Sequence, residues 1–205
     1  MGETEVPIGV VLAGGAGRRM GGGKATVALH GAPLLAYPVA ALQAALPEVV
    51  VVAKPDTELP PLPGVAIWSE PPEPRHPLTG IVHALAFAGG RSVLVCAGDL
   101  PFASAGLVRE LVAAGAAGAP AVVPRAGGRL QPLFARYEPA ALEPLAAALA
   151  DPERLGRLTD VVAALGPRLF ELDDERAFFN VNVPEDLLTA AGLMDGDGAR
   201  APGDA

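Results

Sequence analysis

The chain is organised around residues 8–24, which read Ile-Gly-Val-Val-Leu-Ala-Gly-Gly-Ala-Gly-Arg-Arg-Met-Gly-Gly-Gly-Lys. Residues 8–12 are largely apolar and β-branched, which is typical of a buried parallel strand. The loop after them has six glycines in ten residues and three cations, Arg18, Arg19 and Lys24. Glycines let backbone N–H groups approach a ligand, and N–H groups together with cationic side chains bind phosphate oxygens. The segment therefore predicts a phosphate-binding loop.

Two better-known phosphate loops do not fit this segment. A Walker A loop needs glycine where this chain has Arg18 and Ser or Thr where it has Ala25. The dinucleotide-binding pattern fails because Met20 stands where its third glycine belongs. A flexible glycine-rich surface loop without a chemical role remains as an alternative. The position of the loop, after the first strand of an α/β chain, argues against that alternative.

Composition narrows the class of protein. The chain has 205 residues, 51% of them hydrophobic, and a formal net charge of −8. We expect one domain over residues 1–194, with halves at about 7–100 and 101–192, and a disordered tail over 195–205. Strong negative charge argues against nucleic-acid binding, and no apolar run reaches the roughly 20 residues that span a bilayer. The absence of a visible leader and the single Cys96 favour a cytoplasmic protein.

A second candidate site residue follows another apolar run. Residues 92–97 predict a buried strand, and Asp99 lies directly beyond it in a turn with Gly98 and Pro101. A carboxylate in that place is well suited to hold Mg²⁺ against a nucleotide triphosphate, because Mg²⁺ prefers one or two carboxylates together with phosphate oxygens and water. The alternative is that Asp99 only caps the turn. The phosphate-binding loop on the first strand favours the metal site.

The third candidate lies near the carboxyl end of the chain. Pro184 suits the first turn of a final helix, and two acidic residues follow it favourably at the positive end of the helix dipole. Asn182, just before that helix, offers a neutral oxygen that could complete a metal or substrate site near Asp99. The alternative is that Asn180 and Asn182 only shape the turn.

These segments together resemble one family. The spacing Leu-Ala-Gly-Gly-x-x-x-Arg-Met-Gly-x-x-Lys over residues 12–24 resembles the signature of the MobA-like nucleotidyltransferases. The pattern Asn-x-Asn-x-Pro-Glu-Asp-Leu over residues 180–187 is similar to the segment that closes that fold, and Asp99 matches its metal-binding Asp-x-Pro motif. The resemblance covers most of residues 7–192. It implies a three-layer α/β/α sandwich of the nucleotide-diphospho-sugar transferase type, with a Rossmann-like, mainly parallel sheet.

The resemblance also implies roles for individual residues. Catalytic roles fall to Arg19, Lys24 and Asp99, and metal binding to Asp99 and Asn182. Glu70 is the nearest counterpart of an acidic residue that contacts the guanine or the ribose. The implied nucleotide-binding set is Leu12, Ala13, Gly14, Gly15, Lys24, Glu70 and Asp99. One departure is Gly23, because the family often has Asp immediately before the lysine.

The members most similar to this chain transfer GMP from GTP to molybdopterin, release pyrophosphate and need Mg²⁺. The Gly14-Gly15 pair favours this branch, since related cytidylyltransferases usually carry Ala-Gly there. The implied partners are GTP and molybdopterin, and molybdoenzyme apoproteins or cofactor-insertion proteins after the reaction. Two alternatives stay open: a nucleotidyltransferase that uses CTP or another phosphorylated acceptor, and a catalytically silent nucleotide-binding adaptor.

The remaining pattern predicts alternating strands and helices. Helices are expected over 34–46, 77–88 with Thr79 as its cap, 104–114, 139–150 and 158–165. Further strands are expected over 49–53, 65–69, 121–124, 130–137 and 168–172. Residues 131–134 are similar to a family segment that faces the acceptor. Three nearby arginines, Arg125, Arg129 and Arg136, are candidates for binding the acceptor phosphate or are solvated charges of the hairpin.

Overall fold

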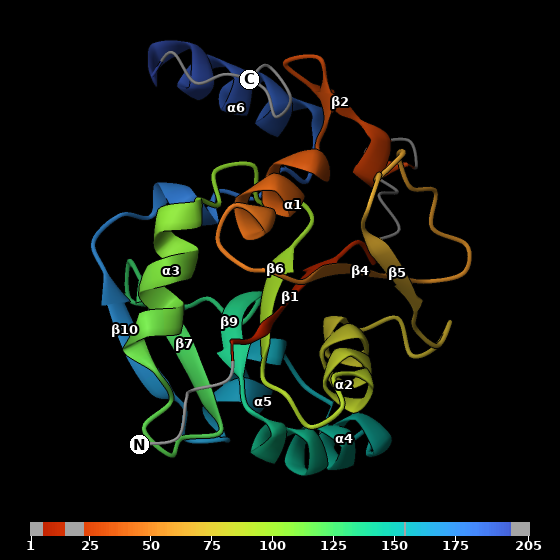
Figure 1. Ribbon diagram of the computed structural model, residues 1–205, viewed down its shortest axis with the longest axis vertical. Coiled ribbons are helices and arrows are strands. Elements are labelled where there is room, and N and C mark those ends of the chain that lie inside the picture. Colours follow the sequence, from red (N-terminus) through yellow and green to blue (C-terminus); the bar gives the residue numbers. More distant parts are fainter. Residues whose placement is uncertain (1–5, 15–22, 154, 198–205) are drawn as a thin grey trace.

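A mixed, mostly parallel sheet forms the centre of the computed structural model, which describes residues 6–14, 23–153 and 155–197 (Figure 1). The sheet order is β10-β7-β9-β6-β1-β4-β5, with β8 paired to β7. Its strands are β1 (Ile8–Leu12), β4 (Val49–Ala53), β5 (Ala66–Ser69), β6 (Val93–Ala97), β7 (Ala121–Ala126), β8 (Arg129–Leu130), β9 (Phe134–Tyr137) and β10 (Arg168–Leu172). A small antiparallel pair stands apart, formed by β2 (Ala28–Leu29) and β3 (Ala32–Pro33).

The helices form the outer layers. They are α1 (Ala36–Gln43), α2 (Pro77–Phe87), α3 (Ala105–Ala114), α4 (Leu142–Ala150), α5 (Leu158–Ala163) and α6 (Pro184–Asp197), with short 3-10 turns η2 (Lys24–Thr26), η3 (Pro139–Ala141) and η4 (Arg176–Phe178). Figure 1 shows α2 beside α4, and α6 beside β2 at the far end of the molecule. This arrangement confirms the predicted α/β fold with a mainly parallel sheet.

Strand alternation divides the core around the sheet into two halves, one on each face, and a third apolar cluster packs α6 against the β2–β3 hairpin. Val11, Val51 and Cys96 pack with α1 and α3, whereas Val10 and Val50 pack with α2, α4 and α5. Successive side chains of a strand point to opposite faces, so strands covered by helices on both faces must be apolar throughout. The all-valine run of β4 and the buried run of β6 meet this requirement.

The sheet is parallel where the predicted site lies. β5, β4, β1 and β6 pair in parallel, so their carboxyl ends meet at one edge. β9 runs antiparallel to β6 and to β7, and it joins the second half of the chain to this parallel block. The sheet is continuous from β5 to β10.

Several predicted boundaries were wrong in detail. The first helix begins at Ala36 rather than residue 34, because residues 28–33 form the β2–β3 hairpin and Leu34 follows it. The strand expected over 130–137 is two short strands, β8 and β9, separated by a turn. The helix expected over 139–150 divides into η3 and α4, with Pro144 in the first turn of α4.

Two further predictions need correction. The cap of α2 is His76 instead of Thr79, because the ring Nδ1 of His76 accepts a hydrogen bond from the N–H of Leu78, while Thr79 lies buried inside the helix. Helix α6 continues through Asp197, so the first three residues of the expected tail are helical; residues 198–205 lie outside the described part of the chain. Among the described residues, no helix has the length and apolar character needed to cross a membrane.

Candidate functional site

A cavity of about 670 Å³ lies at the carboxyl edge of the parallel strands. The ends of four neighbouring strands and the segments after them contribute to its lining, from within residues 12–14 at the end of β1, 54–58 after β4, 70–77 after β5 and 97–99 at the end of β6. Asn182, ahead of α6, and the turn that starts at Gly23 complete the wall. In open α/β sheets, ligands bind at this edge, where strand exits converge.

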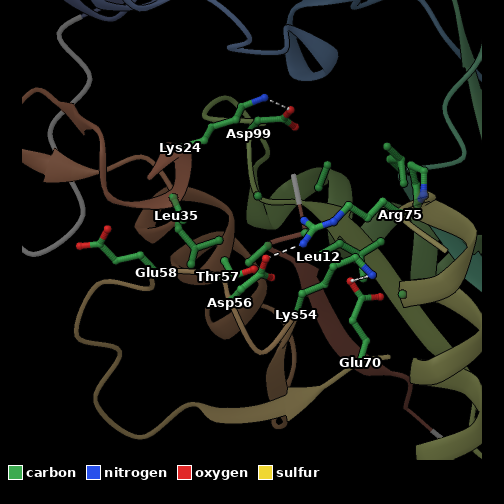
Figure 2. A pocket seen from close by; sticks show the side chains of 18 of the residues that line it. Leu12, Lys24, Leu35, Lys54, Asp56, Thr57, Glu58, Glu70, Arg75 and Asp99 are labelled. Atoms are coloured by element: carbon green, nitrogen blue, oxygen red, sulfur yellow. Dashed lines mark hydrogen bonds and ion pairs between the residues drawn. The ribbon is translucent and has the colours of Figure 1, made fainter. Parts of the chain in front are cut away.

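Three polar side chains meet at one side of the cavity. Lys24 Nζ donates a 2.6 Å hydrogen bond to Asp99 Oδ2 and a 2.8 Å hydrogen bond to Asn182 Oδ1. Figure 2 shows the Lys24–Asp99 pair above the cavity. Lys24, Asp99 and Asn182 stand far apart in the sequence, and the exits of β1 and β6 and the start of α6 bring them together. We call these three residues the cation centre.

The cation centre fits a Mg²⁺ ion. A carboxylate oxygen of Asp99 and the amide oxygen of Asn182 both contact the Lys24 ammonium, so they already face a cation. The other carboxylate oxygen, Asp99 Oδ1, is buried and has no hydrogen-bond partner among the described residues. Mg²⁺ binds through one or two carboxylates plus phosphate oxygens and water. The described residues contain no group of three His, Cys, Asp or Glu side chains that could cage a metal. A Mg²⁺ ion held by Asp99 and Asn182 would therefore need further ligands, such as phosphate oxygens and water.

Backbone geometry positions Lys24. Gly23 precedes η2 with φ of 59° and ψ of 30°, a left-handed conformation that glycine adopts without strain. A Cβ at Gly23 would lie 3.0 Å from Thr26 Oγ1, whose hydroxyl donates to the Gly23 carbonyl. Gly23 thus suits the turn that presents Lys24. This conformation is a local structural reason for glycine at a position where the family often has Asp.

A second ion pair lies at the floor of the cavity. Lys54 Nζ lies 3.4 Å from Glu70 Oε1, and the two side chains are only 6% and 4% exposed. Lys54 follows β4 and Glu70 follows β5, so the pair joins two adjacent strand exits (Figure 2). Burial raises the pKa of Glu70 above its ordinary value, and the positive charge of Lys54 opposes that rise. We call Lys54 and Glu70 the floor pair.

A third ion pair spans the same two loops nearer to solvent. Arg75 binds Asp56 and also lies 3.5 Å from a carboxylate oxygen of Glu73. Its hydrogen bond lowers the pKa of Asp56. Figure 2 shows the Arg75–Asp56 contact across the cavity, beside the floor pair. Because all three side chains are exposed, water and salt screen their charges strongly.

The structure brings most of the predicted site residues to one cavity. Leu12, Ala13, Gly14, Lys24, Glu70, Asp99 and Asn182 all line it. Two predicted residues, Gly15 and Arg19, lie outside the described part of the chain. The sequence reasoning missed Lys54 and Arg75. The sequence position of Lys54 could have indicated a site residue, because Lys54 directly follows a fully apolar strand, much as Asp99 does. No sequence pattern indicated Arg75, since its position depends on the course of a proline-rich loop.

Two of the three candidate acceptor-phosphate arginines have partners elsewhere. Arg125 pairs with Glu171 across β7 and β10, at 2.7 Å. Arg136 is 3% exposed, pairs with Glu138 at 2.6 Å and donates to the Val112 carbonyl. These contacts favour a structural role for both residues within the second half of the sheet.

A comparison with protein-family models decides the family. The model described as the MobA-like NTP transferase domain matches residues 9–168. The chain belongs to this family. Among MobA-like relatives, the molybdenum cofactor guanylyltransferase of Cereibacter sphaeroides is 38% identical over 193 residues, covering 92% of this chain and 97% of the relative. A probable molybdenum cofactor guanylyltransferase of Chloroflexus aggregans is 35% identical and covers 87% of this chain and 90% of its own length.

Solved structures of MobA-like and related proteins share the fold. The molybdopterin-guanine dinucleotide biosynthesis protein A of Archaeoglobus fulgidus has a TM-score of 0.69 at 24% identity, covering 92% of this chain and 98% of that one. The 2-C-methyl-D-erythritol 4-phosphate cytidylyltransferase of Thermus thermophilus has a TM-score of 0.66 at 24% identity, covering 92% and 99%. At these identities the similarity concerns the nucleotidyltransferase fold alone.

Proposed function

We propose that this chain transfers GMP from GTP to the terminal phosphate of molybdopterin. Relatives that span almost its whole length carry the name molybdenum cofactor guanylyltransferase. The observation that carries the proposal is the cation centre, in which a lysine, a carboxylate and an amide from three separate segments meet at the edge of the parallel strands. Such a centre suits a triphosphate and the metal ion that accompanies it.

In the proposed reaction, an oxygen of the molybdopterin phosphate attacks the α-phosphorus of GTP. A new P–O bond forms as the bond between the α-phosphorus and the bridging oxygen breaks, and pyrophosphate leaves with the electron pair of that bond. The attacking phosphate oxygen is already ionised, so the step requires no general base. The main task of the protein is to orient the two phosphates and to offset negative charge in the transition state.

The residues divide this task between them. Lys24 would bind a phosphate oxygen of GTP and offset charge as the pyrophosphate departs. Asp99 and Asn182 would hold Mg²⁺, which would screen the phosphates and stabilise the charge that develops on pyrophosphate. The backbone at Gly14 would lie against the nucleotide at the end of β1, and Glu70 would accept hydrogen bonds from the guanine or ribose.

The test is pyrophosphate release with GTP, CTP and ATP in turn, in the presence of Mg²⁺ and molybdopterin. GTP-selective release that Asp99→Ala abolishes would support both the reaction and the role of Asp99. Selective use of CTP would assign the chain to the cytidylyltransferase alternative. If the protein binds GTP but releases no pyrophosphate with any acceptor that is supplied, it is a nucleotide-binding adaptor, and the proposed transfer is refuted.

A further inference from the structure

The floor pair holds Glu70 more tightly than a single contact would. Lys54 Nζ lies 3.4 Å from Glu70 Oε1 and also donates a 2.7 Å hydrogen bond to the carbonyl of Pro71, the residue after Glu70. The ammonium therefore contacts both the side chain and the backbone of the same short segment. Glu70 N–H in turn donates to the Ala53 carbonyl, which fixes the other side of that segment to the end of β4.

Two glycines leave room for the carboxylate and limit its movement. A Cβ at Gly14 would lie 2.8 Å from Glu70 Oε1, and a Cβ at Gly80 would lie 3.1 Å from Oε2. The carboxylate therefore occupies a slot between the loop after β1 and helix α2, closed on a third side by Lys54. Gly14, Gly80, Lys54 and Glu70 all line the cavity.

One oxygen of this carboxylate remains without a partner. Oε2 is buried and accepts no hydrogen bond from the described residues, whereas Oε1 faces Lys54. A buried carboxylate oxygen without a donor destabilises the folded state, and a ligand that supplies an N–H or O–H group to it gains correspondingly. Glu70 lines the cavity, so a ligand bound there would lie beside this carboxylate.

The chemistry of an ionised carboxylate selects among nucleobases, because such a group only accepts hydrogen bonds. Guanine presents two neighbouring donors, N1–H and the 2-amino group. Adenine and cytosine each present one amino donor beside a ring nitrogen that is itself an acceptor, and that acceptor would face the carboxylate. A site built to hydrogen-bond a group rejects analogues that leave its buried polar atoms unpaired. An immobile, ionised Glu70 would therefore favour guanine.

We propose that Lys54 is a positioning residue for base selectivity: by holding Oε1 of Glu70 and the Pro71 carbonyl, it fixes the carboxylate so that Oε2 meets the N–H edge of guanine. This inference rests on the proposed function. The Lys54 side chain is 6% exposed and contacts Glu70 and Pro71, so its proposed effect on the base acts through Glu70. Without its ammonium, the carboxylate would be free to protonate or turn, and a protonated carboxyl donates as well as accepts.

The experiment measures dissociation constants by titration calorimetry for GTP and for inosine triphosphate, which keeps N1–H but lacks the 2-amino group. Wild-type protein is expected to bind GTP at least about tenfold more tightly, the effect of one hydrogen bond to a charged group. In Lys54→Met, the ratio of the two constants is expected to fall to within about twofold. Lys54→Gln, which keeps an N–H donor for Pro71 but no charge, provides a second folded variant with the same expected loss.

A matched control comes from the opposite end of β4. Arg91→Met removes an ion pair with Glu48, just before β4 begins and outside the cavity lining. This variant should keep the wild-type ratio, which separates a local effect of Lys54 from general weakening of the sheet. A third ligand, 2′-deoxy-GTP, tests whether Glu70 reads the ribose instead, because it lacks one sugar hydroxyl and keeps the base.

The outcomes are distinct. A folded Lys54 variant that keeps the wild-type preference for GTP over inosine triphosphate would overturn the inference. So would a variant that loses discrimination only against 2′-deoxy-GTP, since the carboxylate would then read the sugar. Wild-type protein that binds the two purine nucleotides equally also overturns it, while GTP-dependent transfer to molybdopterin would still stand. Wild-type preference for CTP would instead contradict the proposed function itself.

Discussion

Lys24 Nζ and Asp99 Oδ2 lie 2.6 Å apart, so the ammonium occupies one oxygen of the only carboxylate in the cation centre. Both side chains are largely buried, at 16% and 21% exposure, and Asn182 shares the same ammonium. In the absence of a ligand, the charge of the Asp99 carboxylate is thus balanced by Lys24, and Lys24 already lies beside the proposed phosphate site. In the proposed function, Lys24 would then bind a phosphate oxygen and Asp99 would hold the metal ion.

Removing the charge of Asp99 should lower the rate of GMP transfer more than the affinity for GTP. In Asp99→Asn the single carboxylate of the cation centre is gone, so stabilisation of the leaving pyrophosphate is lost; we expect the turnover rate to fall by at least about a hundredfold. Pyrophosphate release under saturating GTP measures this effect. Asp173→Asn, an exposed carboxylate just past β10, is the control and should retain activity. Equal rates in Asp99→Asn and wild type would remove Asp99 from the mechanism.

Lys24 should discriminate triphosphates from monophosphates. In Lys24→Met we expect GTP affinity to fall by about 10- to 100-fold, the effect of one charge-assisted hydrogen bond to phosphate. GMP affinity should change much less, because GMP has no β- or γ-phosphate for the ammonium to contact. Titration calorimetry with both nucleotides gives the comparison. A parallel loss for GTP and GMP would indicate that Lys24 contacts the α-phosphate or only shapes the site.

Gly14 should not tolerate a side chain. In Gly14→Ala the new methyl group would stand 2.8 Å from Glu70 Oε1, and the buried carboxylate could move only by leaving Lys54. We therefore expect weaker GTP binding together with lower stability. Gly192→Ala is the matched control, since its Cβ would meet nothing within 4 Å and it lies inside α6. Better helix propensity should stabilise that control by about 0.5–1 kcal/mol, measured by urea unfolding.

Loss of Lys54 should destabilise the fold in a pH-dependent way. Lys54→Met leaves the buried Glu70 charge uncompensated, which costs about 3–5 kcal/mol of unfolding free energy at neutral pH. The variant also loses the charge that opposes the rise in the Glu70 pKa, so this pKa lies still further above 4.5. Between 4.5 and that raised value the folded state binds more protons than the unfolded state, so stability rises as pH falls through this window.

Unfolding free energies of wild type and Lys54→Met across that pH range check this prediction. The difference between them should shrink toward acid and be largest near neutral pH. Asp56→Asn is the control, because the Asp56–Arg75 pair spans the same two loops but is exposed, and its loss should leave stability close to that of wild type. A pH-independent cost of Lys54→Met would show that lost packing, rather than the Glu70 charge, causes it.

Cys96 offers a direct probe of unfolding. It is fully buried in β6 between β1 and β9, and burial raises the pKa of its thiol well above the ordinary value. A protonated, inaccessible thiol reacts slowly, so a thiol reagent should label the native chain only through opening of the sheet. GTP should slow the labelling further, because it stabilises the folded state. Labelling of the native chain as fast as of the urea-unfolded chain would contradict this view of the core.

The sequence predicted best what local patterns determine. Apolar runs located β1, β4 and β6, and their parallel pairing placed Gly14 and Asp99 at one edge before any contact was known. Long-range pairing was beyond those patterns: nothing in residues 134–137 indicates that β9 runs antiparallel between β6 and β7. The partnership of Lys54 with the predicted Glu70 was missed for the same reason. Lys54 and Glu70 each follow a strand in the sequence, but only the pairing of β4 with β5 brings their charges together.

The place of β5 in the sheet has a consequence for the residue that follows it. β5 is the last strand on its side and pairs, within the described chain, with β4 alone, whereas β6 is held between β1 and β9. A change in the loop after β5 therefore adjoins a strand with one paired neighbour, while a change after β6 adjoins a strand with two. Glu70 follows the edge strand and Asp99 follows the interior one. In the proposed function, the residue that reads the base therefore follows a strand with one paired neighbour, and the residue that serves the phosphates follows a strand held on both sides.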